Sequence, residues 1–225
     1  MSDADPETLA RLMRARFSCR AFRPDPVPEA TLARIVEASR WAASWSNVQP
    51  WDMLITRPET TLRLADLLVG LARARAPAEP DVPYPPAFDG VYLQRRREVG
   101  FGLYNALGIA RDDRAAREAL FLENFRFFGA PHVALLTMPA AMGAYGALDA
   151  GNFLSAFMLA AHAEGVATIA QAALAQYAGA IREMFAIPGD RAFLCGVALG
   201  HADMSHPANG FRAPRAGTGE IFRFV

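Results

Sequence analysis

From residue 16 onward the sequence reads Arg16-Phe17-Ser18-Cys19-Arg20-Ala21-Phe22, directly before three closely spaced prolines. Arg16, Ser18 and Arg20 alternate where a helical pattern ends and the backbone extends, so their side chains are expected to point the same way. Two guanidiniums and a hydroxyl suit a phosphate, because arginine makes bidentate, charge-assisted hydrogen bonds. A solvated basic stretch would show the same residues, and on this segment alone that interpretation is favoured.

A second polar stretch follows after one more helical pattern and reads Ala42-Ala43-Ser44-Trp45-Ser46-Asn47-Val48-Gln49-Pro50-Trp51. Its serine, asparagine and glutamine side chains can hydrogen-bond the edge of a flat heterocycle, and its tryptophans can cover the face. The alternative is a capped helix end with Trp51 anchoring the turn in the core. That alternative is favoured when the segment is taken alone.

Apolar periodicity predicts one domain over residues 1–225, with more helices than strands. The expected helices cover residues 6–15, a stretch from Pro28 to about Trp41, and then 59–75, 92–109, 112–127, 148–164 and 176–186. The expected strands are 53–56, 133–138 and 193–199. Residues 76–90 hold five prolines and form an irregular segment, which in a compact domain is usually functional or disordered.

Composition limits the partners that the chain can attract. Hydrophobic residues make up 52% of the chain and charged residues 20%, which is enough for one substantial core. The 23 basic and 23 acidic residues give a net charge of zero, so nucleic acid and membranes are not expected partners. Every basic residue other than histidine is arginine, which excludes a Schiff-base lysine and a lysine-containing phosphate loop.

Cysteine and histidine form no recognisable metal or redox motif. Cys19 and Cys195 make no CxxC pair, and Cys19 is interpreted as a packing residue. The histidines lack metal-ligand spacing; they are His132, His162, His201 and His206. The acidic N-terminus lacks the order of a signal peptide, and the longest apolar run, 153–161, is about half a membrane span. A cytoplasmic protein without metal is expected.

Taken together, the two polar stretches resemble the N-terminal signature of the nitroreductase family of flavoenzymes. The resemblance covers about two-thirds of the chain, in the family's order and spacing. It continues through short motifs at residues 151–153, 159–161, 164–166, 170–172, 187–188 and 197–201. The middle segments, 103–109 and 124–131, are similar to those of bacterial nitrobenzoate reductases.

The resemblance implies FMN as the cofactor and assigns its contacts. Arg16 and Ser18, with Phe17 between them, would hold the phosphate, and Arg20 would lie near the ribityl chain and the N1–C2 edge, where a cation stabilises the reduced flavin. The turn would reach the flavin of the other subunit through Ser44, Trp45, Ser46, Asn47 and Gln49. Near N5 and O4 the contacts would come from Ala170, Gln171 and Ala172. Arg212 and Arg215 would close over the phosphate. Ala43 and Ala170 depart from the family pattern, in which proline is common at both positions.

The resemblance also implies an α+β fold with a central, mostly antiparallel sheet flanked by helices. Two chains would form an intertwined homodimer, with a C-terminal tail extending over the partner. NADH or NADPH would reduce the flavin at N5 and leave before a nitroaromatic or related small aromatic acceptor enters, so no side chain is expected to act as the catalyst. Quinone, enone or halogenated aromatic acceptors and a non-catalytic FMN-binding role are the alternatives.

A run of three arginines, Arg95-Arg96-Arg97, has two interpretations. Such a run on a predicted helix is most often a solvated face. If the likeness to nitrobenzoate reductases extends to the substrate, one of these guanidiniums would instead pair with a substrate carboxylate.

Overall fold

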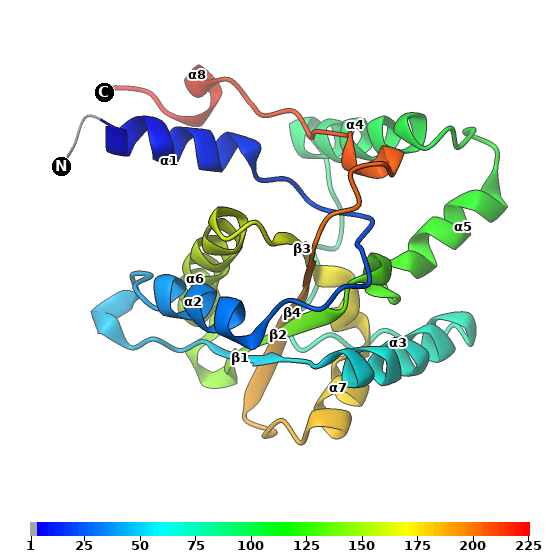
Figure 1. Ribbon diagram of the computed structural model, residues 1–225, viewed down its shortest axis with the longest axis horizontal. Helices are drawn as coiled ribbons and strands as arrows, with labels where there is room; N and C mark the ends of the chain where they lie inside the picture. Colours follow the sequence, from blue (N-terminus) through cyan, green and yellow to red (C-terminus); the bar gives the residue numbers. More distant parts are fainter. Residues whose placement is uncertain (1–3) are drawn as a thin grey trace.

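The computed structural model describes residues 4–225 and shows a four-stranded antiparallel sheet between helices (Figure 1). Its strands are β1 (Asp52–Ile55), β2 (His132–Pro139), β3 (Ala167–Gln171) and β4 (Arg191–Gly200), in the spatial order β1-β2-β4-β3. The expected α+β fold with a mostly antiparallel central sheet is confirmed. Residues 1–3, part of the acidic N-terminal stretch, lie outside the described residues.

The helices surround this sheet. The α-helices are α1 (Ala4–Ala15), α2 (Glu29–Ser39), α3 (Pro58–Arg73), α4 (Gly90–Ala106), α5 (Arg114–Glu123), α6 (Gly143–Ala163), α7 (Ala178–Phe185) and α8 (Thr218–Ile221). Short 3-10 turns are η1 (Trp45–Asn47), η2 (Phe127–Gly129), η3 (Ala140–Met142), η4 (Ala172–Tyr177) and η5 (Pro207–Asn209). Within the described residues, no helix combines the length and the apolar character needed to cross a membrane.

The two central strands, β2 and β4, are apolar on both faces because helices cover both. Val133 and Leu135 of β2 belong to the core that includes Leu64 of α3 and Ile181 of α7. Ala134, which points to the opposite face, belongs to the core formed with α2 and α6. Because alternate residues are buried on opposite faces of the sheet, each of these strands is a continuous apolar run in the sequence. This pattern is why sequence analysis predicted both strands.

The largest differences from the sequence expectations concern β3, α5, α6 and α2. Strand β3 was not predicted; it is short, and its pairing with β4 fixes it as a strand. Helix α5 ends at Glu123, before Phe127 and Phe128 take positive φ values of 56° and 53°. Helix α6 begins at Gly143, earlier than expected, and α2 ends at Ser39, which leaves Trp41 outside the helix and 77% exposed.

Candidate functional site

The stretch 16–22 runs beside β3, at the outer edge of the sheet. Ser18 forms a parallel bridge with Thr168, and the Cys19 amide donates to the Thr168 carbonyl at 3.1 Å. Cys19 is fully buried, and its thiol donates to the Ala21 carbonyl. Burial raises the pKa of the Cys19 thiol, which therefore stays protonated near neutral pH, in agreement with a packing role. The stretch is extended, as its alternating pattern predicts.

Asn209, in η5, fixes this extended stretch to the C-terminal part of the chain. Its side chain is fully buried. Its Oδ1 accepts a hydrogen bond from the Arg20 amide at 2.7 Å, and its Nδ2 donates to the carbonyls of Ala21 and Asp203, both at 2.8 Å. Sequence analysis did not single out Asn209, because no local pattern distinguishes it from an ordinary turn residue.

Two further arginines reach the same place from the C-terminal segment. The Arg212 guanidinium lies 4.0 Å from the centroid of the Phe17 ring, and its Nη1 donates to the Asn209 carbonyl at 2.6 Å. Burial and, after it, the positive charge of Arg215 lower the pKa of Arg16. Arg215 therefore lies near enough to Arg16 to repel it. We call Arg16, Arg20, Arg212 and Arg215 the arginine cluster.

The arginine cluster has no internal counter-charge. None of its four members forms an ion pair with a carboxylate of residues 4–225. Arg20 is partly buried, which lowers its pKa, and its Nη1 donates only to the Ser18 carbonyl at 3.2 Å. Guanidiniums gathered without carboxylates favour an anionic ligand, because an anion relieves their mutual repulsion and accepts their hydrogen bonds.

A cavity of ≈ 320 Å³ adjoins the cluster, between the end of β3 and helices α4 and α5. Its lining residues are Arg20, Gly100, Leu103, Tyr104, Arg117, Leu120, Phe121, Asn124, Phe128, Ile169, Ala170, Gln171, Ala172 and Ala173. The walls are largely apolar and aromatic, with few polar groups, which is the usual character of a site for a planar organic ring.

Gln171 supplies an unused acceptor to this cavity. Its side chain is 3% exposed, and its Nε2 donates to the Asn124 carbonyl at 2.8 Å. Its Oε1 has no hydrogen-bond partner in the described part of the chain. A buried polar atom without a partner is uncommon, so Oε1 is free to accept a hydrogen bond from an N–H of a ligand.

The irregular segment 76–90 contacts η4, two residues of which line the cavity, and is held there by hydrogen bonds. The Tyr84 hydroxyl donates to the Ala172 carbonyl at 2.7 Å, and burial raises the pKa of Tyr84. The Glu79 amide donates to the Gln176 carbonyl at 2.8 Å. Asp81 pairs with Arg182 and accepts from a β4 amide, so the segment is ordered against η4, α7 and β4.

The second predicted stretch, the turn 44–49, lies at the edge of the molecule next to α2, whereas residues 16–22 run nearer its middle, beside β3 (Figure 1). Three of its residues have left-handed backbones: Ser46, Asn47 and Gln49, with φ of 48°, 57° and 47°. Each such residue stores about 1–3 kcal/mol unless its surroundings stabilise it, and strained turns of this kind cluster at functional sites. Asn47 and Gln49 are exposed.

Asp149, which sequence analysis did not assign to the site, holds this strained turn. It is buried on α6, and both of its carboxylate oxygens accept from the Trp45 amide, at 3.0 and 3.2 Å. The Gln49 amide donates to the Ser44 hydroxyl at 3.0 Å, which closes the turn. A signal existed in the sequence: Asp149 is the single carboxylate in the 21 residues of an apolar helix.

The structure therefore brings together one part of the predicted site and leaves another part separate. The residues that gather around the cluster and the cavity are Arg16, Phe17, Ser18, Arg20, Ala170, Gln171, Ala172, Arg212 and Arg215. The residues of the distant turn are Ser44, Trp45, Ser46, Asn47 and Gln49. One chain does not place both groups around one ligand.

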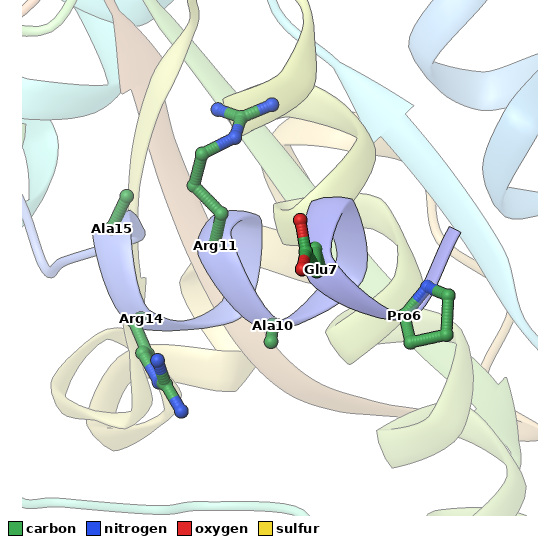
Figure 2. Close-up of a pocket in the computed structure, with 6 residues that line it drawn as sticks. All are labelled: Pro6, Glu7, Ala10, Arg11, Arg14 and Ala15. Atoms are coloured by element: carbon green, nitrogen blue, oxygen red, sulfur yellow. The ribbon is translucent and has the colours of Figure 1, made fainter. Parts of the chain in front are cut away.

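A larger hollow, of ≈ 680 Å³, lies along α1 and carries no convergent chemistry. Figure 2 shows its lining, in which the side chains of Arg11 and Arg14 extend to opposite sides of the helix. Within residues 4–225, no group of three or more His, Cys, Asp or Glu side chains is arranged to bind a metal ion. The cavity beside the arginine cluster is thus the candidate site.

The fold and the site define an α+β protein with an anion site next to an apolar cavity. Residues 13–201 match the model of the nitroreductase family, and the chain belongs to that family. It is 41% identical over 219 residues to the nitroreductase NfnB of Mycolicibacterium smegmatis, covering 97% of this chain and 93% of the relative. It is 31% identical to a 4-nitrobenzoate reductase of Pseudomonas putida, covering 91% and 89%.

A solved structure supports the same assignment. The FMN-dependent nitroreductase NfnB of Mycobacterium smegmatis, in complex with NADPH, superimposes with a TM-score of 0.93 at 39% identity. The superposition covers 98% of this chain and 99% of that chain. The family resemblance read from the two polar stretches is therefore confirmed.

Proposed function

We propose that this chain is an FMN-dependent NAD(P)H oxidoreductase that reduces nitroaromatic or related small aromatic acceptors. The observation that carries the proposal is the arginine cluster without counter-charge beside an apolar cavity. A phosphate fits the cluster and a planar ring fits the cavity, and FMN joins the two groups. The free Gln171 Oε1 supplies the acceptor that an N–H of the ring requires.

The protein's contribution is binding and orientation. When bound, FMN supplies hydride chemistry at its N5 atom. Arg16 and Ser18 hold the phosphate, and Arg212 and Arg215 close over it from the C-terminal segment. Arg20, which lines the cavity, would place a positive charge beside the N1–C2 edge of the ring and would thereby favour the reduced, anionic form.

The rest of the ring environment comes from the end of β3 and from the cavity walls. Gln171 and its neighbours Ala170 and Ala172 orient the edge that carries N5 and O4. The apolar residues of α4 and α5 exclude water from the opposite wall, which protects a reduced centre from side reactions. NADH or NADPH and the acceptor use this cavity in turn.

We further propose a homodimer in which the turn 44–49 contacts the flavin held by the partner's arginine cluster. The turn lies away from the arginine cluster of its own chain and has strained backbone angles. Its Trp45 amide is bound by the buried Asp149, and the side chains of Asn47 and Gln49 are exposed. Trp45, Tyr145 and Leu148 leave more than half of their surface exposed around it, which an interface would cover.

The C-terminal residues supply the tail that extends over the partner. Ile221, Phe222 and Phe224 are 71%, 56% and 93% exposed in the isolated chain. Such side chains gain stability when a second subunit buries them. We propose a cytoplasmic location and one FMN-binding domain over residues 1–225.

Anaerobic spectroscopy tests the proposed function. The purified protein is mixed with FMN, desalted, and titrated with NADPH or NADH in the absence of oxygen. We expect a yellow protein that loses its absorbance with one or both donors and regains it on addition of a nitroaromatic acceptor. A protein that binds FMN but is not bleached by either donor would be a carrier, and the proposal would be wrong.

A further inference from the structure

The cavity beside the arginine cluster carries a second positive charge, at the wall opposite Arg20. Arg20 and Arg117 are the charged residues of the lining, and no aspartate or glutamate contributes to it. Arg20 extends from the stretch 16–22 and is partly buried next to the end of β3. Arg117 extends from α5 instead.

Arg117 is positioned by neutral groups. Its guanidinium lies 5.1 Å from the centroid of the Tyr104 ring, on α4. Its Nη1 donates to the Arg111 carbonyl at 3.1 Å. It forms no ion pair with any carboxylate of residues 4–225, so its charge stays available to a ligand.

The three arginines that the sequence offered for substrate binding do not line this cavity. Arg95 is ion-paired with Glu220 at 3.0 Å, and the Arg96 guanidinium lies 4.9 Å from the centroid of the Phe88 ring. The first residue of α4 that lines the cavity is Gly100. An anionic group of an acceptor in this cavity would therefore meet Arg117 of α5 and none of the arginines 95–97.

The remaining walls select for an aromatic ring next to that charge. The other lining residues include the apolar side chains of Leu103, Leu120, Phe121 and Phe128. A ring with an anionic substituent would stack against the apolar wall and place its charge at the guanidinium.

We propose that Arg117 binds the carboxylate of the acceptor, so that the enzyme prefers anionic nitroaromatic acceptors to neutral ones of the same shape. This inference rests on the proposed FMN-dependent function and adds the substrate class. A bidentate guanidinium–carboxylate pair at the rim of an apolar cavity is expected to favour the anionic acceptor by roughly tenfold in kcat/KM.

The test compares 4-nitrobenzoate with its methyl ester, which keeps the ring and the nitro group and removes the charge. The FMN-loaded enzyme is reduced anaerobically with NADPH, and the rate constant of reoxidation is measured with each acceptor. We expect the ratio of the acid rate constant to the ester rate constant to be about tenfold higher in the native enzyme than in Arg117→Gln. The comparison between enzymes is needed because the ester also withdraws electrons more strongly than the carboxylate does. Arg117→Lys should retain part of the preference, because it keeps the charge and loses the bidentate geometry.

Arg114→Gln is the matched control, since Arg114 lies on the same helix, is exposed, and does not line the cavity. The Arg114→Gln variant should keep the acid-to-ester ratio of the native enzyme. An acid-to-ester ratio that Arg117→Gln leaves unchanged, or an Arg117→Gln effect on reduction by NADPH instead of on that ratio, would overturn the inference. Failure of NADPH to reduce the bound flavin would contradict the proposed function itself, so the two failures are distinguishable.

Discussion

The stretch 16–22 and the turn 44–49 carry similar polar residues but are supported in opposite ways. The first stretch is joined to β3, to η2 and to the C-terminal segment through backbone pairs and the buried Asn209. The turn rests on one helix through Asp149 and leaves its asparagine and glutamine exposed. The first region is held by contacts within its own chain, whereas the second leaves its polar side chains exposed.

The largest effect should follow loss of the Asn209 side chain. Asn209→Ala removes three hydrogen bonds and leaves the Arg20 amide without a partner, whereas the carbonyls of Ala21 and Asp203 keep other donors. We expect about 2–4 kcal/mol lower stability in urea unfolding and poor FMN retention. Asn152→Ala is the control on the turn side, since Asn152 makes only one long bond, 3.4 Å, to Ala43. Equal losses of stability in Asn209→Ala and Asn152→Ala would contradict the difference in support between the stretch 16–22 and the turn 44–49.

Next in size is the loss of one phosphate contact. Arg16→Ala should weaken FMN binding by about 1.5–3 kcal/mol, because one charge-assisted contact disappears from the cluster. Flavin fluorescence quenching gives the dissociation constant. Arg23→Ala is the matched control, since Arg23 is exposed just beyond the stretch. An unchanged dissociation constant for Arg16→Ala would show that the cluster does not bind the phosphate.

The third prediction tests whether the turn serves the partner's flavin. Asn47→Gly is the appropriate change, because glycine accepts the φ of 57° and only the side chain is lost. We expect weaker FMN binding by about 1 kcal/mol. Heterodimers of Asn47→Gly with Arg16→Ala, isolated with two affinity tags, should contain one intact site per dimer. If they bind FMN no better than either mutant homodimer, both residues act on the same chain's flavin.

Cys19→Ser should have a small effect, although Cys19 lies in the middle of the first stretch. A serine hydroxyl can donate to the Ala21 carbonyl as the thiol does, so we expect a stability loss of about 1 kcal/mol and near-native flavin reduction. Stopped-flow reduction with NADPH is the measurement. A loss of reduction rate beyond about a hundredfold with FMN bound, far more than one hydrogen bond can account for, would assign Cys19 a redox role.

The smallest predicted change is in the titration of His162. Burial, followed by the positive charges of Arg16 and Arg11, lowers the pKa of His162. A phosphate bound at Arg16 offsets that repulsion, so FMN should raise the pKa of His162, measured by NMR titration with and without the cofactor. A pKa of His162 that FMN leaves unchanged would place the phosphate elsewhere.

Sequence analysis predicted the parts of the site that depend on local pattern. The alternation of Arg16, Ser18 and Arg20 indicated an extended backbone, and the structure has one. The continuous apolar runs of β2 and β4 identified the central strands. It did not identify β3 or Asn209, whose roles depend on partners far away in the chain: the Arg20–Asn209 bond spans 189 positions.

The amino-acid sequence by itself determined the family, the order of most helices and strands, and the two polar stretches, because motif order, periodicity and turn chemistry act over short windows. Tertiary structure alone decided that Asn209 fixes the stretch 16–22 and that Asp149 holds the turn 44–49. It also placed Arg117, instead of Arg95–Arg97, in the cavity. The physical reason is that these neighbours are set by how helices pack on the sheet, and packing joins residues that no local pattern relates.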